Sequence, residues 1–238
     1  MLAVLTDFLL PALCGLCGSR VDQTGALCAA CWHKLTFIAP PCCVRCGVPF
    51  TTPAAAGLEC AACLADPPSY SKARAALVYD EVGRKLISRF KYGDKLHLLP
   101  TFVPWLQRAA TDLQSGVDVI VPVPLHWSRL WRRRYNQSAL LARALGQVTG
   151  LPVDLHGLRR TRRTARQVGM TRAQRLKNVR DAFAVRTDYT GRIVLLMDDV
   201  HTTGATLEAC TTALQNAGAQ EVRVLTLARV VRPEQVDA

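Results

Sequence analysis

Eight cysteines arranged as four Cys-x-x-Cys pairs constrain the N-terminal part of this chain more than any other feature does. The pairs are Cys14/Cys17, Cys28/Cys31, Cys43/Cys46 and Cys60/Cys63. Two residues between two thiolates let one tight turn present both sulfurs to a metal ion, and a second turn completes a tetrahedron. Gly18 and Gly47 follow the second cysteine of the first and third pairs, where such a turn favours glycine.

The spacing predicts two zinc sites in series. Ten residues separate the first two pairs and thirteen separate the last two. The sites would be formed by Cys14, Cys17, Cys28 and Cys31, and by Cys43, Cys46, Cys60 and Cys63; an interleaved pairing, first with third and second with fourth, also fits the spacing. Four thiolates leave no open position for a substrate, so both Zn²⁺ ions are expected to be structural. The metal is expected to supply much of the folding energy of a segment with little apolar mass.

Disulfides and a redox-active pair are the alternatives to zinc. Residues 1–13 are apolar but include Asp7 and lack a basic region, so we expect an amphipathic helix there and no signal peptide. Without an export signal an oxidising compartment is not indicated, which favours zinc. No apolar run approaches the roughly 20 residues of a membrane-spanning helix, and a cytoplasmic protein is expected. Cys42 and His33 are expected to be bystanders beside the ligands, and Cys210 a core residue.

The positive charge of the chain is concentrated after the cysteine segment. The formal net charge is +12. Residues 1–66 hold three basic and four acidic side chains, whereas residues 67–238 hold 27 basic and 14 acidic ones, a net charge of +13. This excess could attract the phosphates of a nucleotide, pyrophosphate or nucleic acid. An arginine-rich solvated surface is the plain alternative.

Residues 194–206 read Val-Leu-Leu-Met-Asp-Asp-Val-His-Thr-Thr-Gly-Ala-Thr, and predict a strand with two carboxylates at its end and a turn that opens a helix. Ligands bind beyond the carboxyl ends of strands in an open α/β sheet, and a helix N-terminus binds anions. Asp198 and Asp199 can accept hydrogen bonds from two ribose hydroxyls, and residues 202–206 can hold a 5-phosphate. Gly204 lets the backbone approach the ligand closely. The alternative is an ordinary strand and helix, in which adjacent buried acids are costly.

This run resembles the phosphoribosyl pyrophosphate (PRPP) signature of type I phosphoribosyltransferases, with apolar residues, two acids and Thr-Thr-Gly-x-Thr in that order. The resemblance implies a PRPP site formed by Asp198, Asp199, Val200, His201, Thr202, Thr203, Gly204, Ala205 and Thr206. Asp198 and Asp199 are the candidate catalytic residues within it. His201 has no fixed role in that motif.

A basic loop, residues 124–134, follows a predicted strand at 117–123, and four arginines lie within residues 129–134. Guanidinium groups bind phosphate oxygens bidentately. Pro-Val-Pro-Leu at 122–125 and Arg-Arg-Arg-Tyr-Asn-Gln at 132–137 resemble the ComF (GntX-like) family. The resemblance implies that pyrophosphate is bound by Arg132, Arg133 and Arg134. A solvated basic helix start is the alternative, although cations are unfavourable at a helix N-terminus.

A second basic segment, residues 159–180, holds nine basic side chains and no acid. Repulsion at that density opposes a compact structure without an anionic ligand. The family resemblance implies a flexible lid that closes over PRPP and excludes water. Its recurrent polar positions are Gln167, Arg172, Arg175 and Asn178, of which Arg172 and Arg175 are catalytic candidates.

Nucleic acid is the other partner that such basic segments fit. Residues 159–180 contain no aromatic side chain on which a base could stack. Trp127, Trp131 and Tyr135 interleave with the first basic loop. That loop is therefore the better candidate for binding single-stranded DNA.

Asp66-Pro67-Pro68-Ser69 predicts a boundary between a double zinc ribbon, residues 1–66, and a phosphoribosyltransferase domain, residues 67–238. Strands are predicted at 73–79, 117–123, 153–155, 182–185, 193–197 and 222–228, and helices at 81–92, 96–107 and 135–148, the second interrupted near Pro100 and Pro104. This alternation predicts an α/β fold with a doubly wound, mostly parallel sheet, of the type I phosphoribosyltransferase class.

The resemblance implies displacement of pyrophosphate from C1 of PRPP by a nitrogen base, with Mg²⁺ neutralising the departing charge. It also links the family to natural competence, DNA uptake and nucleotide salvage, so PRPP, single-stranded DNA and the uptake machinery are expected partners. Two other classes of function stay open: a non-enzymatic single-stranded DNA-binding competence factor, and a PRPP-sensing regulator on the same fold. No segment identifies the accepting base.

Overall fold

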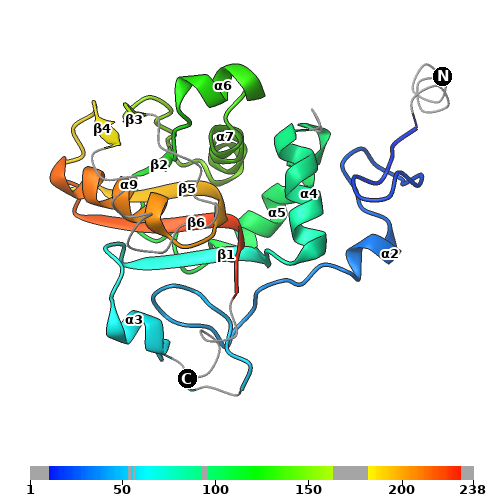
Figure 1. Ribbon diagram of the computed structural model, residues 1–238, viewed down its shortest axis with the longest axis horizontal. Helices are drawn as coiled ribbons and strands as arrows, with labels where there is room; N and C mark the ends of the chain where they lie inside the picture. The colour runs from blue at the N-terminus through cyan, green and yellow to red at the C-terminus, as the bar shows by residue number, and fades with distance from the viewer. Residues whose placement is uncertain (1–10, 53–54, 56, 93–95, 163–181, 232–238) are drawn as a thin grey trace.

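A four-stranded parallel sheet forms the centre of the protein (Figure 1). The computed structural model describes residues 11–52, 55, 57–92, 96–162 and 182–231. The sheet has the order β1-β6-β5-β2, formed by β1 (Lys72–Val78), β6 (Glu221–Arg229), β5 (Ile193–His201) and β2 (Val119–Pro122). Because neighbouring strands are parallel, their carboxyl ends meet at one edge.

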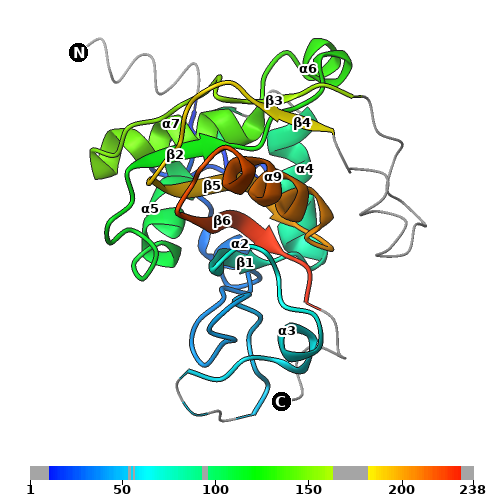
Figure 2. The same ribbon diagram turned by 90° about the vertical axis from the view of Figure 1, so that its left-hand side faces the viewer.

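Alternating apolar residues bury both faces of this sheet. In β5, Leu195 and Met197 face one layer, whereas Val194 and Leu196 face the other. The first layer contains helices α4 (Glu81–Tyr92), α5 (Leu99–Ala109) and α7 (Gln137–Thr149), with the short 3-10 helix η1 (Leu96–Leu98). Helix α9 (Ala205–Asn216) covers the second face, as Figure 2 shows. The doubly wound α/β fold predicted from the sequence is therefore confirmed.

Strand β5 is longer than its apolar run predicts. The sequence predicts that the strand ends at Met197, but it continues to His201. Its extension pairs with β6, where Asp198 lies opposite Thr226 and His201 opposite Arg229. The ladder continues because β6 supplies partners for Asp198, Val200 and His201, so both acids lie inside the strand and not after it.

Three other segments differ from the predicted elements. The basic loop at 124–134 contains a helix, α6 (Trp127–Arg133). Residues 153–155 form only a parallel bridge, between Val153 and Ile120. Helix α5 continues through Pro104, whereas an interruption was expected. Strands β3 (Leu158–Arg160) and β4 (Phe183–Val185) form a further, antiparallel pair. The sequence predicts β4, as a strand at 182–185, but not β3.

Residues 36–45 of the cysteine segment lie along the free edge of β1. The cysteine segment contains two short helices, α2 (Ala29–Trp32) and α3 (Ala61–Ala65), each beginning directly after a cysteine. Phe37 pairs with Leu77 of β1 in an antiparallel bridge. The domain boundary near residue 66 stays a prediction. Among the described helices, none has the length and apolar character that crossing a lipid bilayer requires.

Candidate functional site

Asp198 lies half-buried at the carboxyl edge of the sheet, where hydrogen bonds fix its side chain. Its Oδ1 accepts hydrogen bonds from Ser138 Oγ and from the backbone N–H of Asp199, both at 2.8 Å. Burial and the neighbouring charge of Asp199 raise the pKa of Asp198 to about 7. Ser138 is placed by Asn136, whose side chain accepts from the Ser138 N–H and caps α7. This carboxyl group is therefore oriented before any ligand arrives.

Asp199 forms an ion pair with a residue that sequence reasoning missed. Lys91 Nζ lies 2.8 Å from Asp199 Oδ1, and only 16% of the Lys91 side chain is exposed. Burial acts to lower the pKa of Lys91, but the charges of Asp199 and Asp198 outweigh it and raise that pKa. A lysine in the last turn of an amphipathic helix is usually a solvated charge that complements the helix dipole, so the sequence offered no signal for this contact.

The turn after β5 leaves the N-terminus of α9 open to a ligand. Gly204 has φ of +81° at the N-cap of α9, where no side chain caps the helix. Thr203 Oγ1 is buried and has no hydrogen-bond partner within the described part of the chain. The turn borders a small hollow that is open to solvent and is lined by Asp198, Val200, Thr202, Gly204, Thr206 and Leu207. Free N–H groups at this position suit an anion.

His201 packs behind the turn and away from the hollow. Burial, with the nearby charge of Arg229, lowers its pKa well below the usual value, so the ring is neutral. A Cβ at Gly204 would come within 3.1 Å of His201 Nε2, which is tighter than ordinary contacts. The ring of Tyr70 meets His201 edge-on, with centroids 6.1 Å apart. His201 thus supports the shape of the turn.

The three arginines predicted to bind pyrophosphate differ in their surroundings. Arg133 donates to Tyr92 Oη at 2.6 Å and to Gln137 Oε1 at 3.2 Å, and its guanidinium lies over the Tyr92 ring. Arg134 is exposed and has φ of 66° at the end of α6. Only the backbone of Arg132 is described. The predicted lid residues Gln167, Arg172, Arg175 and Asn178 lie outside the described residues.

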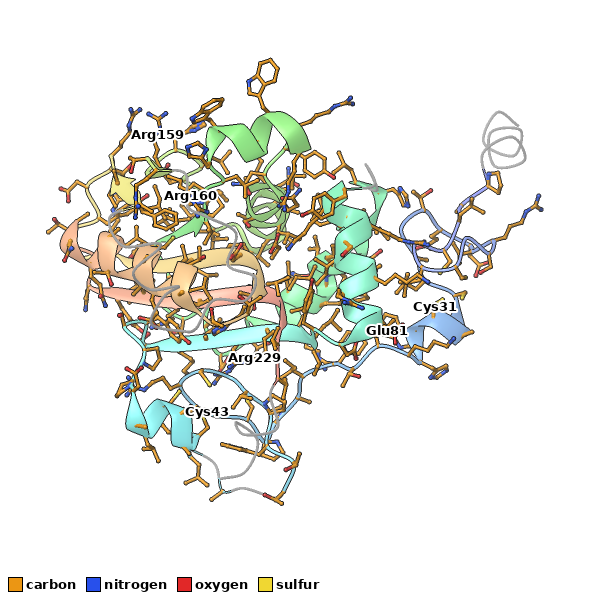
Figure 3. All side chains as sticks on the ribbon, viewed as in Figure 1. Cys31, Cys43, Glu81, Arg159, Arg160 and Arg229 are labelled. Carbon is orange, nitrogen blue, oxygen red and sulfur yellow. The ribbon has the colours of Figure 1, made fainter. Side chains whose placement is uncertain are left out.

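Helix α6 exposes large apolar side chains near this edge of the sheet. Trp127 is 69% exposed, Trp131 85% and Leu130 40%. Strand β3 lies near α6 in both ribbon views, and Figure 3 shows Arg159 and Arg160 on that side of the molecule. Aromatic and basic side chains therefore occur together on this face.

The eight cysteines of the pairs gather into two groups of four. One contains Cys14, Cys17, Cys28 and Cys31, and the other Cys43, Cys46, Cys60 and Cys63. Within each group the sulfur atoms lie within 4.8 Å of one another, so each can hold one metal ion. This is the serial grouping and not the interleaved one. Figure 3 shows Cys31 and Cys43 on different sides of the molecule.

These features define a class of protein: a double zinc ribbon joined to a phosphoribosyltransferase-like α/β domain. The family model described as "Double zinc ribbon domain" matches residues 5–64, and that described as "Phosphoribosyl transferase domain" matches residues 137–237. The chain belongs to the ComF family, and it matches two curated members over nine tenths or more of their length.

Three relatives show the extent of the match. Competence protein F of Haemophilus influenzae is 32% identical over 211 residues, which are 85% of this chain and 90% of the relative. DNA utilization protein YhgH of Escherichia coli K12 is 31% identical over 228 residues, 93% of this chain and 98% of the relative. Competence protein ComFC of Streptococcus pneumoniae is 28% identical over 156 residues, which are 66% of this chain and 67% of the relative.

Proposed function

We propose that this protein binds PRPP with Mg²⁺ and transfers its phosphoribosyl group to a nitrogen base. The observation that carries the proposal is the hollow between Asp198 and the uncapped turn at Gly204. The oriented, half-buried carboxyl group of Asp198 and the uncapped N-terminus of α9 both border this hollow. These are the two groups that a ribose 5-phosphate requires: acceptors for hydroxyls and donors for a phosphate.

Each part of PRPP has a proposed partner. Asp198 and Asp199 accept hydrogen bonds from the ribose hydroxyls, and residues 202–206 bind the 5-phosphate. Arg132, Arg133 and Arg134 contribute positive charge near the pyrophosphate, and Arg172 and Arg175 close over it. Carboxylate oxygens are ligands that Mg²⁺ accepts, so the two acids fit this ion. When bound, Mg²⁺ neutralises charge on the leaving group.

The reaction needs orientation and charge stabilisation more than proton transfer. The bond between C1 and the pyrophosphate oxygen breaks, and the oxygen keeps the electron pair. A base nitrogen forms the new bond to C1 and loses its proton to solvent. The protein's contribution is to hold the ribose and stabilise the leaving anion. The two cysteine groups, each with a structural Zn²⁺, would hold the N-terminal module, residues 1–66, together in a cytoplasmic protein.

Calorimetry with Mg²⁺ and PRPP tests the site directly. The wild-type protein is expected to bind with a micromolar Kd, and Asp198→Asn/Asp199→Asn to abolish binding because the ribose loses both charged acceptors. Asp22→Asn is the matched control, since Asp22 is an exposed carboxylate of the cysteine segment. No binding by the wild-type protein would refute the proposal. Binding without pyrophosphate release, with any base offered, would identify a PRPP sensor.

A second candidate function, single-stranded DNA binding, rests on α6. Exposed indole rings are platforms for base stacking, and nearby arginines neutralise phosphates. The names of the relatives refer to competence and DNA utilization. Replacing Trp127 and Trp131 by alanine should weaken oligonucleotide binding by about 1–3 kcal/mol per ring, measured by fluorescence anisotropy at several salt concentrations. Binding that falls with Asp199→Asn instead would argue against a separate DNA surface.

A further inference from the structure

Lys91 is the described cation that directly contacts the acids of the proposed PRPP site. It reaches from the last turn of α4 to Asp199, with 2.8 Å between Nζ and Oδ1. Arg133, by comparison, is engaged by Tyr92 and Gln137. The positive charge closest to the two acids therefore comes from a helix that the PRPP signature does not include.

The backbone around Lys91 is fixed by the segment that joins α6 to α7. Tyr135 Oη donates to the carbonyl of Phe90 at 2.6 Å, and Gln137 Nε2 donates to the carbonyl of Lys91 at 3.3 Å. Arg133 binds the next residue, Tyr92. Three consecutive residues of α4 are thus attached to the same segment, and the base of the Lys91 side chain has a defined position.

The head of the Lys91 side chain is held by a single ion pair. Among the described residues, its side-chain partner is Asp199. An ammonium group on a flexible four-carbon stem can turn between two anions without moving the backbone. A ribose hydroxyl that binds Asp199 would take over the oxygen that Lys91 now contacts.

Charge explains why a cation is needed at this point. Two adjacent carboxylates repel a ligand that carries several phosphate charges, and their burial strengthens the repulsion. A lysine that neutralises Asp199 in the free protein can offset part of the diphosphate charge in the complex, while the ribose hydroxyls take over the hydrogen bonding of Asp199.

We propose that Lys91 is a diphosphate-binding residue, which leaves Asp199 when the ribose binds and contacts the diphosphate at C1. This inference rests on the proposed function, and it adds a subsite at the end of α4. It predicts that Lys91 contributes to the affinity for PRPP but not to the affinity for ribose 5-phosphate, which lacks the diphosphate.

The experiment compares the two ligands by calorimetry with Mg²⁺, using the wild-type protein and Lys91→Met. Loss of a charged hydrogen bond should lower PRPP affinity at least about tenfold and change ribose 5-phosphate affinity less than about threefold. Lys85→Met is the matched control, since Lys85 is an exposed residue of the same helix. Lys91→Arg, which keeps the charge and guards against misfolding of Lys91→Met, should retain most of the PRPP affinity.

Three results would overturn the inference. Equal losses for both ligands would mean that Lys91 only positions Asp199. PRPP binding that is unchanged or tighter in Lys91→Met, and also unchanged in Lys91→Arg, would mean that Lys91 does not contact the diphosphate. The lysine would then pair with Asp199 only in the ligand-free protein. If the wild-type protein binds neither ligand, the proposed function itself fails, and that result is visible before any Lys91 variant is compared.

Discussion

The two cysteine groups have the same four ligands and the same turn, yet they are attached to different parts of the protein. The first group, defined by Cys14, packs on the helical layer: Arg89 of α4 donates to the carbonyl of Gly15 at 2.7 Å, and Gly15 lies against Leu98. One of its ligands, Cys17, is exposed, and hydrogen bonds with Ser19 lower the pKa of the Cys17 thiol to about 6.

The second group, defined by Cys43, is attached to strands. All four of its cysteines are buried, and together with Val48 and Phe50 they form a small core of their own. Arg74 of β1 donates to the carbonyl of Val44 at 3.1 Å, and Arg229 at the end of β6 donates to the carbonyl of Cys46. Figure 3 shows Arg229 beside this group.

The same arrangement of four cysteines therefore supports two different parts of the fold. The first group supports the outer side of α4 and α5. The second contacts Arg229, which pairs with His201, and His201 lies behind the turn at Gly204. A disturbance at the second group therefore has a short path to the proposed phosphate-binding turn, whereas the first group is connected to the other side of the site through α4, which carries both Arg89 and Lys91.

The largest expected effect comes from removing one ligand of each group. Cys60→Ser and Cys17→Ser should each reduce zinc from two ions per chain to one, measured by metal analysis. A structural Zn²⁺ contributes about 10–16 kcal/mol of apparent binding free energy to folding. Only Cys60→Ser should also abolish PRPP binding and destabilise the α/β domain, because its group supports the sheet. Cys42→Ser is the control that should keep both ions. Identical behaviour of the two ligand variants would show that both groups support the α/β domain to the same extent.

An intermediate effect is expected from the arginines that attach the groups. Arg229→Met should destabilise the protein by about 3 kcal/mol, since it leaves a buried carbonyl without its charged donor, and should weaken PRPP binding about tenfold at unchanged zinc content. Arg89→Met should cost about 1 kcal/mol and leave PRPP binding intact. Chemical denaturation and calorimetry measure the two quantities. Equal effects of both variants on PRPP would show that the second group is not coupled to the turn.

The smallest expected effect is a pH dependence of PRPP affinity that comes from Asp198 and does not involve the second cysteine group. A carboxyl group accepts hydrogen bonds from both hydroxyls best when ionised. Because the pKa of Asp198 is raised to about 7, its ionised fraction rises between pH 6 and pH 8. PRPP affinity should increase about tenfold over that range relative to Asp198→Asn. Arg229→Met should keep this dependence, since burial and Asp199, and not Arg229, raise that pKa. A flat profile for the wild-type protein would contradict the argument.

Local sequence predicted the elements that depend on neighbours in the chain. Cysteine spacing predicted the serial groups, and the order of strand, acids and turn predicted the surroundings of Gly204. Lys91 and Arg229 could not be predicted, because they reach their partners only when α4 and β6 pack against β5. The extension of β5 to His201 likewise depends on β6. The basic loop was not expected to be helical, because its arginines suggested a binding loop more strongly than its periodicity suggested a helix.

The contact between Cys46 and Arg229 sets an order of events on the ribosome. The two residues are 183 positions apart, so at ordinary elongation rates roughly 10 to 40 s pass between their synthesis. All eight paired cysteines are made before the first strand of the sheet. Metal can therefore be captured by a nascent segment whose supporting strand does not yet exist. Zinc binding by the four cysteine pairs can therefore precede formation of the sheet that supports the second group.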